Sequence, residues 1–151
     1  MTEPRKTRVF GPDSSTGLRL AVVDDEAEFR SLVRRVSEPL GWTVVEYENG
    51  RKLIDDLARP PYPDLILLDM VMPHLDGIET VSWLASTSHR CPIILVSGKL
   101  PAYSDVAVSV GEARGLEIID VLRKPVEIGR LREALSPDRL GIAARSRNGS
   151  D

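Results

Sequence analysis

Between residues 17 and 136, short apolar runs, two of which (65–68 and 92–97) are continuous, alternate with stretches in which apolar residues recur every three or four positions. Continuous runs are typical of strands in a sheet covered on both faces, and the second pattern is typical of amphipathic helices. Regular alternation of strand and helix predicts a doubly wound α/β domain with a parallel sheet and right-handed crossovers. The five predicted strands are residues 18–23, 42–47, 65–68, 92–97 and 118–122.

Helical periodicity marks the segments between and after these strands. The segment before the last strand is ambiguous, since residues 106–110 alternate like a strand, although Ser104 and Asp105 suit the start of a capped helix. We expect a helix there. The apolar faces of the other four predicted helices are Phe29, Leu32, Val33 and Val36; Leu53, Ile54 and Leu57; Ile78, Val81 and Leu84; and Ile128, Leu131 and Leu135.

The two ends of the chain differ from its middle in composition. Residues 1–16 and 137–151 are rich in Ser, Pro, Gly, Arg and Asp and contain few aliphatic residues, so neither end buries enough surface to offset its ordering entropy. We expect a mobile N-terminal tail, one domain over residues 17–136, and a mobile C-terminal tail.

Charge and cysteine content exclude several classes of function. The net charge is −3 with both signs spread along the chain, so there is no broad basic surface for nucleic acid. No run of 18 apolar residues is long enough for a membrane span. The single cysteine, Cys91, excludes an internal disulfide and a cysteine-based metal cluster and fits a reducing compartment. We expect a cytoplasmic protein that binds neither nucleic acid nor membrane.

Polar side chains follow four of the five predicted strands, at the carboxyl edge where parallel sheets bind ligands. Asp24 and Asp25 follow the first strand, Asp69 the third, Ser97 ends the fourth, and Lys124 follows the fifth. Carboxylates about 5 Å apart repel by roughly 3 kcal/mol per pair at an intermediate dielectric, so we expect a cation between them. An all-oxygen acidic site suits Mg²⁺ better than zinc.

A structural role is the alternative for each of these residues. Asp25 could cap the helix that begins near Glu26, but a cap explains only one of two adjacent carboxylates. Ser97 and Lys124 would each be unremarkable alone. Their shared position at strand ends favours a functional site.

These residues, taken in order, resemble a known family. Asp24-Asp25, Asp69 followed by MVMPHLDG, Ser97-Gly98 and Lys124-Pro125 resemble the receiver domain of two-component response regulators, over about residues 17–136. The resemblance implies a flavodoxin-like (βα)5 sheet with strand order 2-1-3-4-5. It also makes the Lys124–Pro125 peptide a candidate for the cis form.

The resemblance implies a role for Asp69 as the phosphoacceptor, phosphorylated by a sensor histidine kinase or a histidine phosphotransfer protein. Ser97 and Lys124 would bind phosphoryl oxygens. The protein would then catalyse only its own phosphoryl transfer and dephosphorylation, and would not otherwise be an enzyme.

The resemblance also implies a bound Mg²⁺ as cofactor. Asp25 would ligate the ion directly, Asp24 through water, and Val71 through its backbone carbonyl, and Asp69 would belong to the same metal site.

Two features depart from the family pattern. Val121 occupies the position, three residues before the lysine, where receivers usually carry an aromatic switch residue. The segment from Ser97 to Lys124 is longer than in most receivers and contains Gly111 and Gly115, similar to receivers that accompany cyclic-dinucleotide phosphodiesterase domains. Both departures concern the surface that reports phosphorylation.

The sequence does not determine how the protein passes its signal on. Only 16 residues follow Leu135, which predicts a stand-alone receiver that docks on an unknown downstream protein, relays phosphate, or drains it from a kinase. A fragment of a longer regulator is also compatible with the sequence. The main alternative function is a binding-only receiver-like module that phosphate does not switch, and Val121 is its chief support.

Two other classes fit the sequence poorly. A haloacid dehalogenase would carry Asp-x-Asp after the first strand, where this chain has Asp24-Asp25-Glu26. A mononucleotide or flavin binder would want a Gly-rich or Ser/Thr-rich phosphate loop there, and the acidic loop would repel phosphate.

Overall fold

A five-stranded parallel sheet forms the centre of the molecule. The computed structural model describes residues 17–70, 77–98 and 101–141. The sheet has the order β2-β1-β3-β4-β5, which confirms the predicted flavodoxin-like topology. The strands are β1 (Arg19–Val23), β2 (Thr43–Tyr47), β3 (Leu65–Asp69), β4 (Ile93–Ser97) and β5 (Ile118–Arg123), each within one residue of its predicted bounds.

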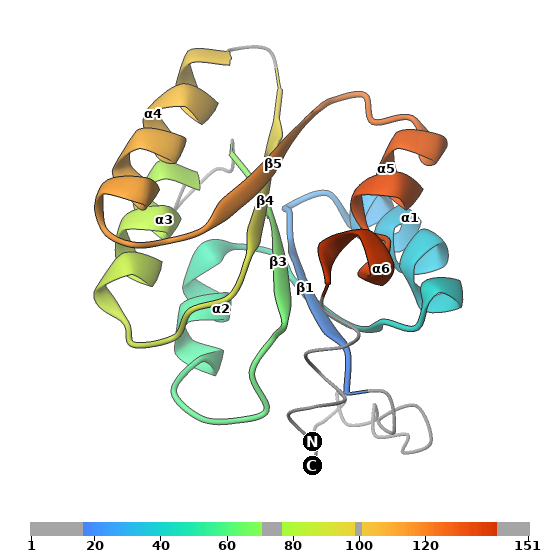
Figure 1. Ribbon diagram of the computed structural model, residues 1–151, viewed down its shortest axis with the longest axis horizontal. Coiled ribbons are helices and arrows are strands. Elements are labelled where there is room, and N and C mark those ends of the chain that lie inside the picture. Colours follow the sequence, from blue (N-terminus) through green and yellow to red (C-terminus); the bar gives the residue numbers. More distant parts are fainter. Residues whose placement is uncertain (1–16, 71–76, 99–100, 142–151) are drawn as a thin grey trace.

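Helices cover both faces of this sheet. Figure 1 shows α2, α3 and α4 on one face and α1, α5 and α6 on the other. In the described ranges, no helix is both long enough and apolar enough to cross a bilayer. The helical elements are α1 (Ala27–Ser37), the 3-10 helix η3 (Glu38–Leu40), α2 (Gly50–Asp56), α3 (Gly77–Ser86), α4 (Pro101–Ala113), α5 (Ile128–Ala134) and α6 (Pro137–Leu140).

The core consists of two apolar clusters, one on each side of the sheet, because successive strand residues point to opposite faces. Leu20 and Val22 of β1 pack with α1 and α5, whereas Ala21 and Val23 pack with α2, α3 and α4. All five residues of β3 and of β4 are buried. This burial on both faces explains why the two strands are apolar up to their last residues, Asp69 and Ser97.

Residues 106–110 are helical, as expected, but the predicted start of their helix was wrong. Helix α4 begins at Pro101, so Ser104 lies inside the helix, where it is buried, and does not precede it. A proline is well suited to the first turn of a helix because its missing N–H has no partner there in any case.

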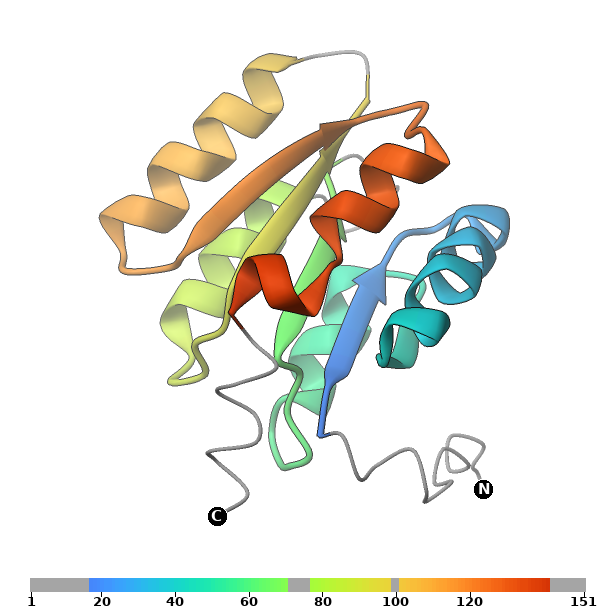
Figure 2. The same cartoon turned by 45° about the vertical axis from the view of Figure 1, so that its right-hand side comes forward.

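The predicted C-terminal tail, residues 137–151, begins with a helical turn that its composition did not indicate. Residues 137–140 form the short helix α6, which begins with the buried Pro137 and directly follows α5 (Figure 2). Leu140 packs against the α1–α5 side of the core. Trp42 anchors this region to the start of β2, because its indole N–H donates to the Leu135 carbonyl at 2.7 Å.

Candidate functional site

Strand parity brings three of the predicted site residues to one face of the sheet. Val22 of β1, Leu67 of β3 and Leu122 of β5 all belong to the α1–α5 core cluster. The residues two positions further on, where the backbone leaves the core, are Asp24, Asp69 and Lys124. Because side chains alternate with a period of two, these three reach the same edge and the same face.

The Lys124 ammonium lies at the centre of this group. Its Nζ is 2.8 Å from Asp24 Oδ2 and 3.7 Å from Asp69 Oδ2. A third carboxylate, Glu26 Oε1, lies 3.3 Å away. The Phe29 ring from α1 makes a cation–π contact, with its centroid 4.7 Å from Nζ. Lys124 is therefore held from β1, β3 and α1 at once.

The predicted acidic cluster is present in the structure. One carboxylate oxygen from each of Asp24, Asp25 and Asp69 lies within 4.8 Å of the others. Asp24 and Asp69 are buried and Asp25 is exposed. Three hard oxygen donors, open to solvent on the Asp25 side, match the ligand preference of Mg²⁺, which keeps several waters. Val71, the fourth predicted ligand, lies outside the described residues.

Burial and charge act in opposite directions on the ionisation of the site. Burial raises the pKa of Asp24 above its ordinary value, although the hydrogen bonds from Lys124 and from the Glu26 backbone oppose this effect. Burial also acts to lower the pKa of Lys124, but its hydrogen bond to Asp24 and the charges of Asp69 and Asp24 outweigh burial and raise that pKa. Lys124 therefore stays charged and offsets only part of the cluster's negative charge.

The loop between β1 and α1 is fixed by hydrogen bonds around Asp24. The Asp24 N–H donates to the Tyr47 carbonyl at 3.0 Å, and Asp24 Oδ1 accepts from the Glu26 N–H at 2.8 Å. The Arg30 guanidinium donates to the Asp24 carbonyl at 2.7 Å and to Glu46 of β2 at 3.1 Å. These contacts hold the acidic loop against the end of β2.

The capping role considered for Asp25 is not observed. Helix α1 begins at Ala27 with Glu26 as its N-cap residue, and the Glu26 side chain makes no capping hydrogen bond. The exposed carboxylate of Asp25 is therefore available to the cluster.

Ser97 lies at the buried end of β4, next to the strand that carries Asp69. In the register of the sheet, Asp69 pairs with Val96, one residue before Ser97. The Ser97 carbonyl accepts from the Lys124 N–H at 2.8 Å, which ties the ends of β4 and β5 together. The Lys124–Pro125 peptide is cis, as expected from the sequence.

Val121, at the expected switch position, lies on the opposite face from Lys124. It pairs with Leu95, a residue of the α2–α3–α4 core cluster, and 38% of it is exposed. An irregularity between Ile93 and Ile94 shifts the register of β5, so that Ile94 pairs with Asp120. The expected switch position beside α4 is therefore occupied by the small aliphatic side chain of Val121.

Three α1-side contacts of the site, from Glu26, Phe29 and Arg30, were not expected from the sequence. Glu26 directly follows the two aspartates at the same strand end, which was an available signal. Phe29 was assigned only to the apolar face of its helix, and Arg30 had no distinguishing pattern. Each role depends on contacts between elements that local sequence does not specify.

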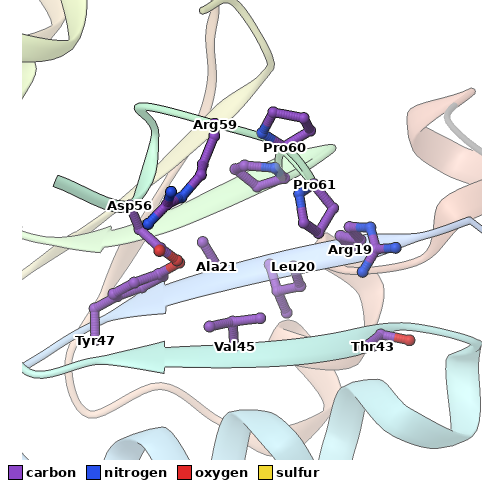
Figure 3. Close-up of a pocket in the computed structure, with 11 residues that line it drawn as sticks. Arg19, Leu20, Ala21, Thr43, Val45, Tyr47, Asp56, Arg59, Pro60 and Pro61 are labelled. Atoms are coloured by element: carbon purple, nitrogen blue, oxygen red, sulfur yellow. The ribbon is translucent and has the colours of Figure 1, made fainter. Parts of the chain in front are cut away.

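A separate hollow of about 150 Å³ lies on the α2 side of β1 and β2. Figure 3 shows Ala21 and Val45 on the strands below it, with Arg59, Pro60 and Pro61 along its rim. None of the acidic cluster residues lines this hollow, so it is distinct from the candidate site.

Comparison with known proteins identifies the family. The model of the response regulator receiver domain matches residues 20–136. A protein-glutamate methylesterase/protein-glutamine glutaminase from Nocardioides sp. is 34% identical over 130 residues, which cover 80% of this chain and 34% of that protein. The sporulation initiation phosphotransferase F of Bacillus subtilis is 27% identical over 117 residues, which cover 78% of this chain and 90% of that protein.

Solved structures agree with the sequence matches. A response regulator from Colwellia psychrerythraea superimposes with a TM-score of 0.67 at 26% identity, covering 85% of this chain and 98% of that one. The chain spans only 30 to 35% of the length of the methylesterase and of two other curated relatives. Most of each of those proteins therefore has no counterpart in the chain. The family match over residues 20–136 nevertheless covers the sheet except for Arg19 and every helix from α1 to α5, and the chain belongs to the response regulator receiver family.

Proposed function

We propose that Asp69 accepts a phosphoryl group from a sensor histidine kinase or a histidine phosphotransfer protein, and that the phosphorylated form docks on a further protein. The observation that carries this proposal is the position of Lys124, within ion-pair distance of both Asp24 and Asp69 at the edge of an acidic cluster. This arrangement joins a carboxylate nucleophile to a fixed cation, as phosphoryl transfer requires.

The acidic cluster fits a bound Mg²⁺. Two buried carboxylates and one exposed carboxylate within 4.8 Å carry more negative charge than Lys124 neutralises, and all their donor atoms are oxygen. Asp24, Asp25 and Asp69 would hold the ion, together with the Val71 carbonyl that the family resemblance implies. When bound, Mg²⁺ supplies Lewis-acid stabilisation of the transferring phosphoryl group.

Asp69 acts as the nucleophile in the proposed reaction. A small donor such as acetyl phosphate makes the balance simple: a bond forms between an Asp69 carboxylate oxygen and phosphorus, the bond from phosphorus to the acetate oxygen breaks, and acetate leaves with the electron pair. Lys124 offsets the negative charge that the donor brings, and the Ser97 hydroxyl donates to a phosphoryl oxygen. The chain would catalyse only this transfer and the later hydrolysis.

Phosphorylation of Asp69 would be transmitted to the protein surface through the end of β4. It adds negative charge and acceptor oxygens beside Ser97, and a shift of the Ser97 hydroxyl toward them would move the β4–α4 loop. The coverage of 90% of the sporulation phosphotransferase supports an output by docking, because that relative is itself of about receiver length. A cytoplasmic location is part of the proposal.

A binding-only module is the second candidate. Val121 favours it, because an exposed valine cannot make the inward rotation of a large ring that usually accompanies phosphorylation in the family. In that case the fold would dock on partners whatever the state of Asp69.

Intact-protein mass after incubation with acetyl phosphate and Mg²⁺ separates the two candidates. We expect a single phosphoryl adduct on the native chain, removed by hydroxylamine and absent from Asp69→Ala, because an acyl phosphate is labile to that nucleophile. If the native chain gains no adduct, or if Asp69→Ala gains the same adduct, the proposed phosphoacceptor role is wrong.

A further inference from the structure

Glu26 makes a contact with the site that neither the sequence motifs nor the proposed reaction requires. Its Oε1 lies 3.3 Å from Lys124 Nζ, and its side chain remains 65% exposed. The same ammonium lies 2.8 Å from Asp24 Oδ2 and 3.7 Å from Asp69 Oδ2. Lys124 therefore donates hydrogen bonds to Asp24 and Glu26, whereas Asp69 lies beyond hydrogen-bond distance from the ammonium.

We propose that Glu26 is a positioning residue that competes with the incoming phosphoryl group for the Lys124 ammonium and so restrains phosphorylation of Asp69. This inference rests on the proposed function, since it assigns a restraint on the same reaction. Lys124 Nζ is farther from Asp69 than from either of the other two carboxylates. Its hydrogen bonds to Asp24 and Glu26 hold the ammonium away from Asp69, so a movement of Lys124 toward a phosphoryl group on Asp69 works against these two contacts.

Glu26 is the partner that gives way most easily. The Asp24 carboxylate is completely buried and also accepts the Glu26 N–H, so its position is fixed by the loop. Glu26 has no other ion-pair partner in the described part of the chain, and water can replace Lys124 around its exposed carboxylate. The Phe29 ring contacts Lys124 in any case and holds the ammonium close to the site.

The negative charge of Glu26 has a second effect in the same direction. It lies within ion-pair distance of the cation that the anionic donor must reach, so it repels the donor as well as occupying Lys124. Both effects are electrostatic at an exposed position, and both are therefore weakened by salt.

The test compares the initial rate of adduct formation from acetyl phosphate in the native chain, Glu26→Gln and Glu28→Gln, at fixed Mg²⁺. Glu28→Gln is the matched control, because Glu28 is an exposed acid in the same first helical turn, its loss changes the net charge equally, and it has no ion pair in the described residues. We expect Glu26→Gln to react about two- to fivefold faster than the native chain, the size expected for one exposed ion pair, and Glu28→Gln to react at the native rate.

Two further measurements separate competition for Lys124 from a structural effect. Glu26→Asp keeps the charge but shortens the side chain by one methylene. We therefore expect its initial rate to lie between that of the native chain and that of Glu26→Gln. The ratio of the Glu26→Gln rate to the native rate should also fall toward one as NaCl rises to about 1 M, where the screening length is about 3 Å.

The outcomes distinguish this inference from the proposed function. Suppose that the native chain forms the adduct but Glu26→Gln and Glu28→Gln react at equal rates, or that salt does not change the ratio of the Glu26→Gln rate to the native rate. Either result would overturn the proposed competition and leave the phosphoacceptor role intact. No adduct on the native chain would overturn the phosphoacceptor role and this inference together.

Discussion

Asp24 is completely buried, and its burial raises its pKa even though Lys124 donates a hydrogen bond to it. A carboxyl whose pKa is higher in the folded protein than in the unfolded chain contributes stability at low pH and loses that contribution as the pH rises through the folded pKa. At neutral pH, the ionised Asp24 therefore costs stability when no cation is bound. The proposed Mg²⁺ would offset this cost when it binds.

Asp24→Asn should consequently stabilise the ion-free protein. In EDTA at pH 7 we expect its free energy of unfolding to exceed that of the native chain by about 1 kcal/mol. The difference should shrink as the pH falls toward the ordinary value for aspartate. Saturating Mg²⁺, at about 100 times its Kd, should add about 2.7 kcal/mol to the native chain only and reverse the order.

Asp25→Asn is the control for that comparison. Asp25 is exposed, so its loss should leave stability in EDTA nearly unchanged while also removing the gain from Mg²⁺. Urea unfolding of the three chains measures all of these differences. If Asp24→Asn were less stable than the native chain in EDTA at pH 7, the ion pair with Lys124 would outweigh burial and this account of Asp24 would fail.

At the scale of the elements, the seven-residue helix α2 is positioned by a close approach to α3. A Cβ added at Gly50, the first residue of α2, would clash with Oγ1 of the buried Thr80 and lie 3.0 Å from its Cβ. Only glycine fits there without a shift of the Thr80 side chain or of one helix against the other. This contact fixes α2 beside the strands that lead into the site.

Gly50→Ala should therefore destabilise the protein by about 1 to 3 kcal/mol through overpacking. Gly129 is the matched control, since it also lies in the first turn of a helix, α5, but a Cβ there would meet nothing within 4 Å. Gly129→Ala should raise stability by roughly 0.5 kcal/mol. Thermal unfolding of both variants checks the pair, and equal effects of the two substitutions would show that the approach of Gly50 to Thr80 does not determine packing.

At the scale of the whole molecule, the fold and the acidic cluster were predictable because they depend on regular patterns. Strand parity and parallel order bring Asp24, Asp69 and Lys124 to one edge of the sheet whatever the details of the loops. The same patterns gave the strand bounds to within one residue. The family resemblance supplied the strand order, which periodicity alone does not determine.

The parts that were missed depend on short-range signals or on contacts between distant elements. The start of α4 was misplaced because Ser104 and Asp105 look like a cap, whereas Pro101 sets the first turn. The helix α6 was missed because the composition of residues 137–151, taken together, concealed one turn anchored by Leu140.

The contact of Glu26 with Lys124 joins residues 98 positions apart. No local pattern reports such a contact, because it depends on how α1 packs against the end of β5.

The identity of the phosphorylated residue is the central claim, and reductive mapping tests it most directly. An acyl phosphate is reduced by borohydride to the alcohol, so a phosphorylated aspartate becomes homoserine, whereas a phosphorylated serine or histidine does not. After treatment with acetyl phosphate and Mg²⁺, borohydride reduction and peptide mass mapping, we predict homoserine at position 69 and none at Asp24 or Asp25. Homoserine at another aspartate, or none anywhere in a chain that carries the adduct, would contradict the account.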